Sequence, residues 1–298
     1  MPGQVETAMI DKATGPVTLD QIVTRVRGLA TLPDVYLRIK RILDDSTSSL
    51  ADVAEALQTD PAMTARLMRV ANSAFYGRPG GISTVARAVT LLGSQQVHDL
   101  VLASAVIQSF DRLVPDPIRP HEFWRGSILA AATAKLLAEH CGFLDSERLL
   151  VAGLLAQVGQ LALMEQLPVQ MGSLAYLASQ SARRPCELQR ETLGFDYADV
   201  GAALFEAWQL PDTLVEPIRH HTRPALADDF ALESAIVHLA VESANAEIEG
   251  TLPEFLLQHL DERAWRQANL SAELFEQIRS EAREVARGLT AAMLDRAA

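Results

Sequence analysis

The stretch DPAMTARLMRVANSAFYGRPGGISTVARAVTLLG, residues 60–93, decides the fold of this chain. Asp60 is a good helix cap and Pro61 suits the first position of a helix, so a helix is predicted to begin here. Asn72 ends it, because its short polar side chain can bond to the backbone. The glycine-rich run GRPGG permits a sharp turn, and a second helix then continues to Gly93. The stretch therefore predicts helices that meet at a tight corner.

Outside this corner, apolar residues recur at helical spacing. The composition, 49% hydrophobic but only 5% aromatic, favours helix over sheet. Three prolines within residues 115–120 interrupt the pattern and suggest an internal boundary. Beyond it, helices are expected near residues 121–140, 146–166, 169–181, 185–193, 197–208, 212–221, 230–248, 253–268 and 271–294. The fold class predicted is all-α.

The breaks in the pattern predict four parts. They are a flexible leader (residues 1–17), an N-terminal helical half (18–118), a second helical half packed on the first (119–248) and a set of C-terminal helices (249–298).

Charge and cysteine content restrict the function. The formal net charge is -12, so the long-range field repels phosphate backbones and anionic lipid, and general nucleic-acid binding is not expected. Cys141 and Cys186 lie far apart without a CxxC spacing, so neither a redox pair nor a thiolate metal site is predicted. The N-terminus lacks the basic segment and apolar run of a signal peptide, and no apolar stretch is expected to reach the roughly 20 residues that a membrane span needs. A soluble, cytoplasmic chain without a cofactor is expected.

The histidines are the first place to look for a metal ligand or a general base. His220 and His221 are adjacent, and neighbouring side chains on a helix diverge by about 100°, so they do not easily share one ion. His238 lies in the apolar run AIVHLA and is interpreted as a core histidine. No GxSxG, GxxxxGK[ST], GxGxxG or HExxH motif occurs.

Residues 60–93 resemble the signature stretch of the HDOD family, which is related to the HD-type metal phosphohydrolases. The resemblance rests on the Asp-Pro pair, the NSAFYG turn, the glycine-rich break and the helix that ends LLG. It continues through FWRGS at 123–127, AGLLAQVGQLAL at 152–163 and WQLP followed by IRHH at 208–221. It implies a multi-helix fold in which an N-terminal helical subdomain packs on an HD-like subdomain, with Trp124 and Trp208 at or near its core.

The resemblance also indicates where an HD-type enzyme would hold its metal. Such enzymes use a histidine, a His-Asp pair and a further aspartate to bind metal and activate water. Here Gly126 stands where related sequences often carry histidine, and Ala156 and Gln157 occupy the His-Asp pair. Tyr197 occupies another such place, and Val241 stands where an aspartate is expected. The resemblance therefore implies a vestigial metal centre and no enzymatic activity.

The function expected is a non-catalytic regulatory module of bacterial signal transduction that binds a signalling protein. Its candidate binding residues at the corner are Asn72, Ser73, Phe75 and Tyr76, because an aromatic pair beside a glycine turn can present an anchor. An architectural role for the corner, with both rings in the core, is an equal alternative.

Two further alternatives stay open. In one, the old catalytic cleft binds a nucleotide or another small molecule, with polar contacts from Gln157, Gln160, Arg219 and His220. In the other, a phosphohydrolase uses a relocated metal site, built from residues among Glu191, Asp196, Asp199, His220 and His221. The second is disfavoured because these residues do not form a known ligand pattern.

Overall fold

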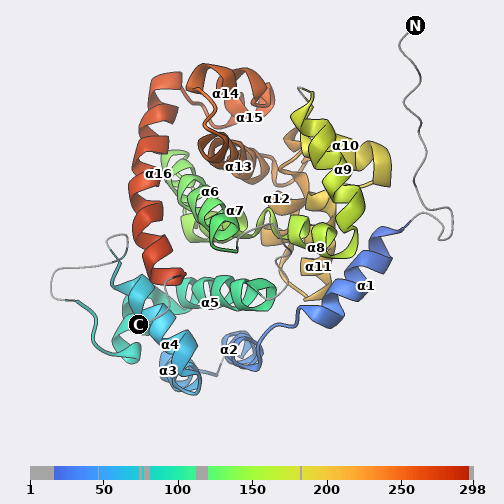
Figure 1. The fold of residues 1–298 in the computed structure, drawn as a ribbon. Coiled ribbons are helices and arrows are strands. Elements are labelled where there is room, and N and C mark those ends of the chain that lie inside the picture. Colours follow the sequence, from blue (N-terminus) through green and yellow to red (C-terminus); the bar gives the residue numbers. More distant parts are fainter. Residues whose placement is uncertain are drawn as a thin grey trace, which may run out of the picture.

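The computed structural model describes residues 17–45, 47–73, 76, 81–111, 120–181 and 183–294. Within these residues every regular element is a helix, as Figure 1 shows, which confirms the all-α prediction. The leader predicted for residues 1–17 lies outside the described residues except for Val17.

The helices before the proline-rich boundary gather around one long helix. They are α2 (Asp34–Asp44), α3 (Leu50–Gln58), α4 (Pro61–Ala71) and α5 (Val85–Asp111), and the first three all pack against α5. Asp60 caps α4 as predicted, since its carboxylate accepts from the amides of Ala62 and Met63 at 2.9 Å. The bend in α5 falls at Gly93, whose φ of +81° suits glycine.

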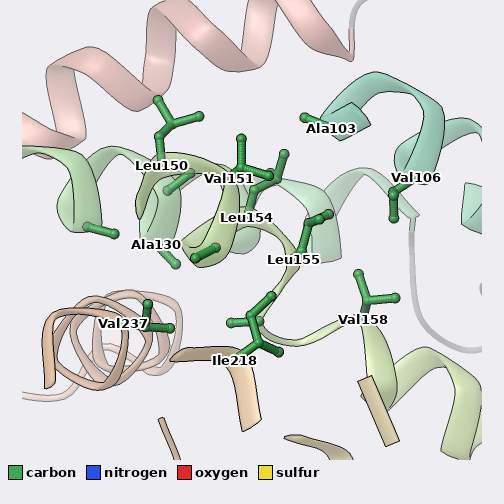
Figure 2. Close-up of a cluster of buried hydrophobic side chains, with 14 of the residues drawn as sticks. Ala103, Val106, Ala130, Leu150, Val151, Leu154, Leu155, Val158, Ile218 and Val237 are labelled. Carbon is green, nitrogen blue, oxygen red and sulfur yellow. The ribbon is translucent and has the colours of Figure 1, made fainter. Parts of the chain in front are cut away.

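The second group of helices follows the boundary. They are α6 (Pro120–His140), α7 (Ser146–Leu155), α8 (Val158–Gln166), α9 (Pro168–Ser179), α10 (Pro185–Leu193), α11 (Tyr197–Ala207), α12 (Asp212–His220), the 3-10 helix η1 (Pro224–Leu226) and α13 (Ala231–Glu249). Helix α7 lies at the centre, against α6, α12, α13 and α5. Figure 2 shows its side chains between those of the surrounding helices. The contact between α7 and α5 joins the two groups into one apolar core.

Helices from both ends of the chain pack across these groups. Helix α1 (Leu19–Leu29) packs against α8 and α11 of the second group. The C-terminal helices are α14 (Pro253–His259), α15 (Glu262–Gln267) and α16 (Ala272–Met293). Helix α16 runs along α6 and reaches α4, where Arg69 Nε donates to the carbonyl of Ala292 at 2.9 Å. The boundaries between the four predicted parts stay predictions. Helices α1 and α16 both pack against helices of the second group, and α16 also reaches α4.

One predicted helix is wrong in its detail. The chain does not form a single helix over 146–166 but breaks at Ala156 and Gln157, where Gln157 has φ -99° and ψ 4°. The same stretch, Ser146–Gln166, is long and apolar enough to cross a membrane, which was not expected from the sequence, and the location of the chain stays a prediction. In the fold 72% of its most apolar window is buried, as in the core helices of many proteins.

The two tryptophans lie where the resemblance placed them. Trp124 on α6 is fully buried, and Trp208 packs against the rings of Phe110 and Phe205 at the edge of the core.

Candidate functional site

The signature corner is held together by Asn72. Its amide Nδ2 donates to the carbonyls of Met68 at 3.0 Å and Ile82 at 2.8 Å, and its Oδ1 accepts from the amide of Ile82 at 2.6 Å. The side chain thus joins the end of α4 to the chain entering α5. Asn72 therefore has the architectural role that the motif suggested.

The other corner residues differ in position. Ser73 Oγ is buried, and no described residue forms a hydrogen bond with it. Phe75 lies outside the described residues. Tyr76 is half-buried, and its hydroxyl donates to the carboxylate of Glu147 on α7. The hydroxyl of Tyr76 therefore points into the protein rather than toward a partner.

Tyr76 belongs to a buried charged cluster that links the corner to the second group of helices. Lys135 on α6 forms an ion pair with Glu147, and both residues are less than a tenth exposed. The Lys135 ammonium lies 4.8 Å from the centre of the Tyr76 ring, a cation–π distance. Burial, followed by the negative charge of Glu147, raises the pKa of Tyr76 far above its ordinary value, so the hydroxyl stays protonated.

Three of the four positions that the resemblance assigns to a vestigial metal centre lie at one stretch of α13. A Cβ atom on Gly126 would lie 2.5 Å from Cδ1 of Ile248. Gln157 Nε2 donates to Oδ1 of Asn245 at 3.0 Å. Asn245 and Ile248 are about one turn apart on α13, and Val241 lies one turn before Asn245. These three residues therefore share one face of α13. Ala156 is fully buried beside Gln157.

This arrangement offers almost no metal-ligand chemistry. Gly126 has no side chain, and the side chains of Ala156 and Val241 carry no atom with a lone pair to donate. Gln157 carries only a neutral amide, which is already bonded to Asn245. The side chains present do not fit the histidine-carboxylate centre of an HD-type enzyme, and Ile248 occupies the space in front of Gly126.

A chain of hydrogen bonds connects the next helices. Gln189 Nε2 donates to Gln160 Oε1, and Gln189 Oε1 accepts from the amide of Tyr197, both at 2.9 Å. The Tyr197 hydroxyl then lies 3.0 Å from Nε2 of His221. Gln160 and Tyr197 therefore make their hydrogen bonds to other residues of the protein.

The HDOD domain model matches residues 29–224 of the chain. The chain belongs to the HDOD family. The match begins at the end of α1 and ends in η1, so it includes the signature corner, Gly126 and the Ala156–Gln157 break.

A curated relative is similar over part of its length. An uncharacterised protein of Treponema pallidum (strain Nichols) is 26% identical over 215 residues, which make up 70% of this chain and 40% of that protein. The chain thus spans about two fifths of the length of the curated relative that it matches.

Solved structures share the HDOD fold. An HDOD domain protein of unknown function from Geobacter sulfurreducens has a TM-score of 0.73 at 23% identity, with 93% of this chain and 100% of that chain covered. A protein from Shewanella amazonensis SB2B, provisionally named a phosphohydrolase, has a TM-score of 0.71 at 23% identity, covering 91% and 96%. A protein from Marinobacter aquaeolei VT8, provisionally named a signal transduction protein, has a TM-score of 0.69 at 21% identity, covering 95% and 64%.

The acidic residues considered for a relocated metal site each pair with a different arginine. Asp196 caps α11 and pairs with Arg190, while Asp199 pairs with Arg223 and Glu191 with Arg183. Within the described ranges, no group of three or more His, Cys, Asp or Glu side chains is placed to hold a metal ion.

The four proposed nucleotide contacts are also engaged within the protein. Gln157 bonds to Asn245 and Gln160 to Gln189. Arg219 pairs with both Glu206 and Glu216, and His220 Nε2 lies 3.2 Å from Glu216. The acidic partners neutralise the guanidinium that a phosphate would need.

His221 and His238 are core histidines with both ring nitrogens in use. Each Nδ1 faces a backbone carbonyl, that of Ile218 at 2.6 Å and that of His221 at 2.9 Å, so each Nδ1 carries the proton. The Nε2 atoms then accept, from the Tyr197 hydroxyl and from the amide of Asp261. Burial lowers the pKa of both histidines to about 4.

Acid is therefore expected to destabilise the fold. Both histidines are neutral when folded but take up protons near pH 6.5 when unfolded, so their contribution is complete above pH 6.5 and is lost as the pH falls toward 4. The loss is up to about 3 kcal/mol for each histidine. Glu242, whose pKa burial raises, offsets part of it.

Urea unfolding between pH 7.5 and 4.5 measures this loss. His238→Asn keeps a donor for the carbonyl of His221 but cannot titrate, so its stability should fall less steeply with acid. A pH slope equal to that of the wild type would show that His238 does not contribute.

Proposed function

We propose that this HDOD chain is a non-catalytic module of bacterial signal transduction that acts in the cytoplasm by binding a protein partner. The proposal is supported by the lack of a metal-binding side chain at Gly126, Ala156 and Val241, where the resemblance leads us to expect ligands, together with the amide pair between Gln157 and Asn245. A fold that has lost the ligands of its enzymatic relatives at several positions retains a surface for recognition.

The signature corner is the proposed partner surface. Asn72 joins the end of α4 to Ile82, and the Tyr76 hydroxyl bonds to Glu147 on α7, so these described residues of the corner are positioned before a partner arrives. Such preorganisation lowers the entropic cost of binding. The polar side chains of the former cleft, by contrast, are bonded to one another or to acidic residues.

The corner and the cleft can be compared directly. We expect Tyr76→Ala to weaken partner binding by about tenfold or more, as a truncated hot-spot residue does, and Gln157→Ala to change it by less than about threefold. Tyr76→Phe separates the roles of the ring and the hydroxyl. Capture of one specific protein from a lysate of the source organism, quantified for variants at a temperature where all are folded, gives the readout.

The opposite ranking would place the function in the former cleft. A second measurement tests catalysis: hydrolysis of bis(p-nitrophenyl) phosphate with added Mn²⁺, Fe²⁺, Zn²⁺ or Mg²⁺ should stay at the background rate. Metal-dependent turnover that His220→Ala abolishes would overturn the non-catalytic proposal and support a relocated site.

A further inference from the structure

Helix α9 presents an apolar face to solvent. It packs against α8 and α10 through Met171 and Leu174, at the edge of the molecule in Figure 1. The opposite side exposes Val169 by 75%, Tyr176 by 68% and Leu177 by 51%. Large apolar side chains with this exposure, gathered on one helix face, are typical of a surface that another molecule covers.

The α9 face is also free of charge. No charged residue occurs in residues 166–182, although charged residues make up 21% of the chain. The chain carries a net charge of -12, so two copies that approach through acidic surfaces repel each other. A neutral face is where that repulsion is smallest.

Two serine hydroxyls of α9 are already satisfied. Ser173 Oγ donates to the carbonyl of Val169 at 3.0 Å, and Ser179 Oγ donates to the carbonyl of Tyr176 at 2.7 Å. Covering the face would therefore leave neither hydroxyl without a partner, which removes a common cost of burial.

The sequence of α9 is complementary to itself in the antiparallel direction. Val169, Gly172, Tyr176 and Ser179 are spaced by three, four and three residues, so they form one outward stripe. A two-fold axis at the height of Leu174 brings Tyr176 opposite Gly172, and Val169 opposite Ser179. Each bulky side chain then faces a small one, and Gly172 has open space around it.

Opposite charges flank the two ends of α9. Glu165, near the end of α8, precedes the neutral stretch, and Arg183, between α9 and α10, follows it. The antiparallel arrangement therefore brings the end of α9 that follows Glu165 in one copy toward the end that precedes Arg183 in the other. Arg183 already pairs with Glu191 at the surface, and a guanidinium has donors for both carboxylates.

We propose that α9 is the interface of a symmetric homodimer, in which two α9 helices pack antiparallel with Tyr176 seated on the partner's Gly172. A helix of 12 residues is about 18 Å long, and one helix pair buries less than the roughly 1,200 Å² of a standard stable interface. The dimer should therefore form in a concentration-dependent way.

Sedimentation equilibrium of the full chain from about 1 to 500 µM tests the proposal. The mass should rise from 32.4 kDa toward twice that value. Tyr176→Glu, which places charge on the neutral face, should keep the chain monomeric. Leu144→Glu is the matched control, because Leu144 is fully exposed and lies outside α9. This variant should dimerise to the same extent as the wild type.

Charge reversal and cross-linking test the direction of the helices. Glu165→Arg and Arg183→Glu should each raise the dissociation constant severalfold, and the double variant should restore it. In a Cys141→Ser background, chains with Val169→Cys should form disulfides with chains carrying Ser179→Cys, but not with one another.

Other outcomes would overturn the proposal. A chain that stays monomeric at every concentration has no such interface, and Val169→Cys homodimers would indicate parallel helices. A monomer that instead sediments with phosphatidylcholine vesicles, and loses this binding with Tyr176→Glu, would identify α9 as a membrane-contacting face.

Discussion

Gly159→Ala should lower the free energy of unfolding by about 3 to 4 kcal/mol, because overpacking is most costly where the neighbours are rigid. A Cβ atom at this position would lie 1.9 Å from the carbonyl oxygen of Tyr197 and 2.6 Å from the amide nitrogen of Gly201. Both are backbone atoms, so no side chain can turn away, and α8 and α11 would have to separate. Because α1 packs on the same two helices, its contact would be disturbed as well.

Gly288→Ala is the control for this substitution. Gly288 lies within α16, with no heavy atom within 4 Å of its would-be Cβ, so alanine should stabilise the helix by about 0.5 to 1 kcal/mol. Urea unfolding of the two variants should give changes of opposite sign. If Gly159→Ala were as stable as the wild type, the close crossing of α8 and α11 would be wrong.

The close crossing shows what the sequence could not reveal. Patterns within one stretch predicted the cap at Asp60 and the end of a helix at Gly93, because their causes are local. Gly159 and Gly201 are adjacent only through tertiary packing, and each alone reads as a glycine in a helix. The break at Ala156–Gln157 was missed because no proline interrupts the apolar run there, although the sequence carries Gly153 and Gly159 on either side.

The candidate site stays a prediction from the resemblance. The structure places Gly126, Gln157 and Val241 at one face of α13. The resemblance could not identify Asn245, which lies 88 residues from its partner Gln157 in the sequence, because a single sequence does not say which distant polar residues meet. Lys135 could have been found, since it stands alone in the apolar run AAATAKLLA, and a buried lysine requires a partner.

Glu147→Leu is expected to destabilise the protein by about 3 to 5 kcal/mol, because it removes one member of a buried ion pair, the carboxylate that contacts the ammonium of Lys135. Glu139 lies 3.8 Å from that ammonium but is itself half exposed, so its charge is screened by solvent and compensates only in part. The Tyr76 hydroxyl loses its acceptor in the same variant. Since Tyr76 lies in the signature corner, the corner should loosen together with the core, and amide hydrogen exchange should rise at Ile82.

The double variant Lys135→Met, Glu147→Leu separates the cost of an unpaired charge from the loss of packing. Replacing both members of a buried ion pair with apolar residues of similar volume is often neutral or stabilising, so the double variant should recover most of the stability lost by Glu147→Leu. Hydrogen exchange at Ile82 should stay raised, because the Tyr76 hydroxyl still lacks Glu147. Equal stability of the single and double variants would show that the penalty comes from packing around α7, and protection of Ile82 in both would show that the corner does not depend on Glu147.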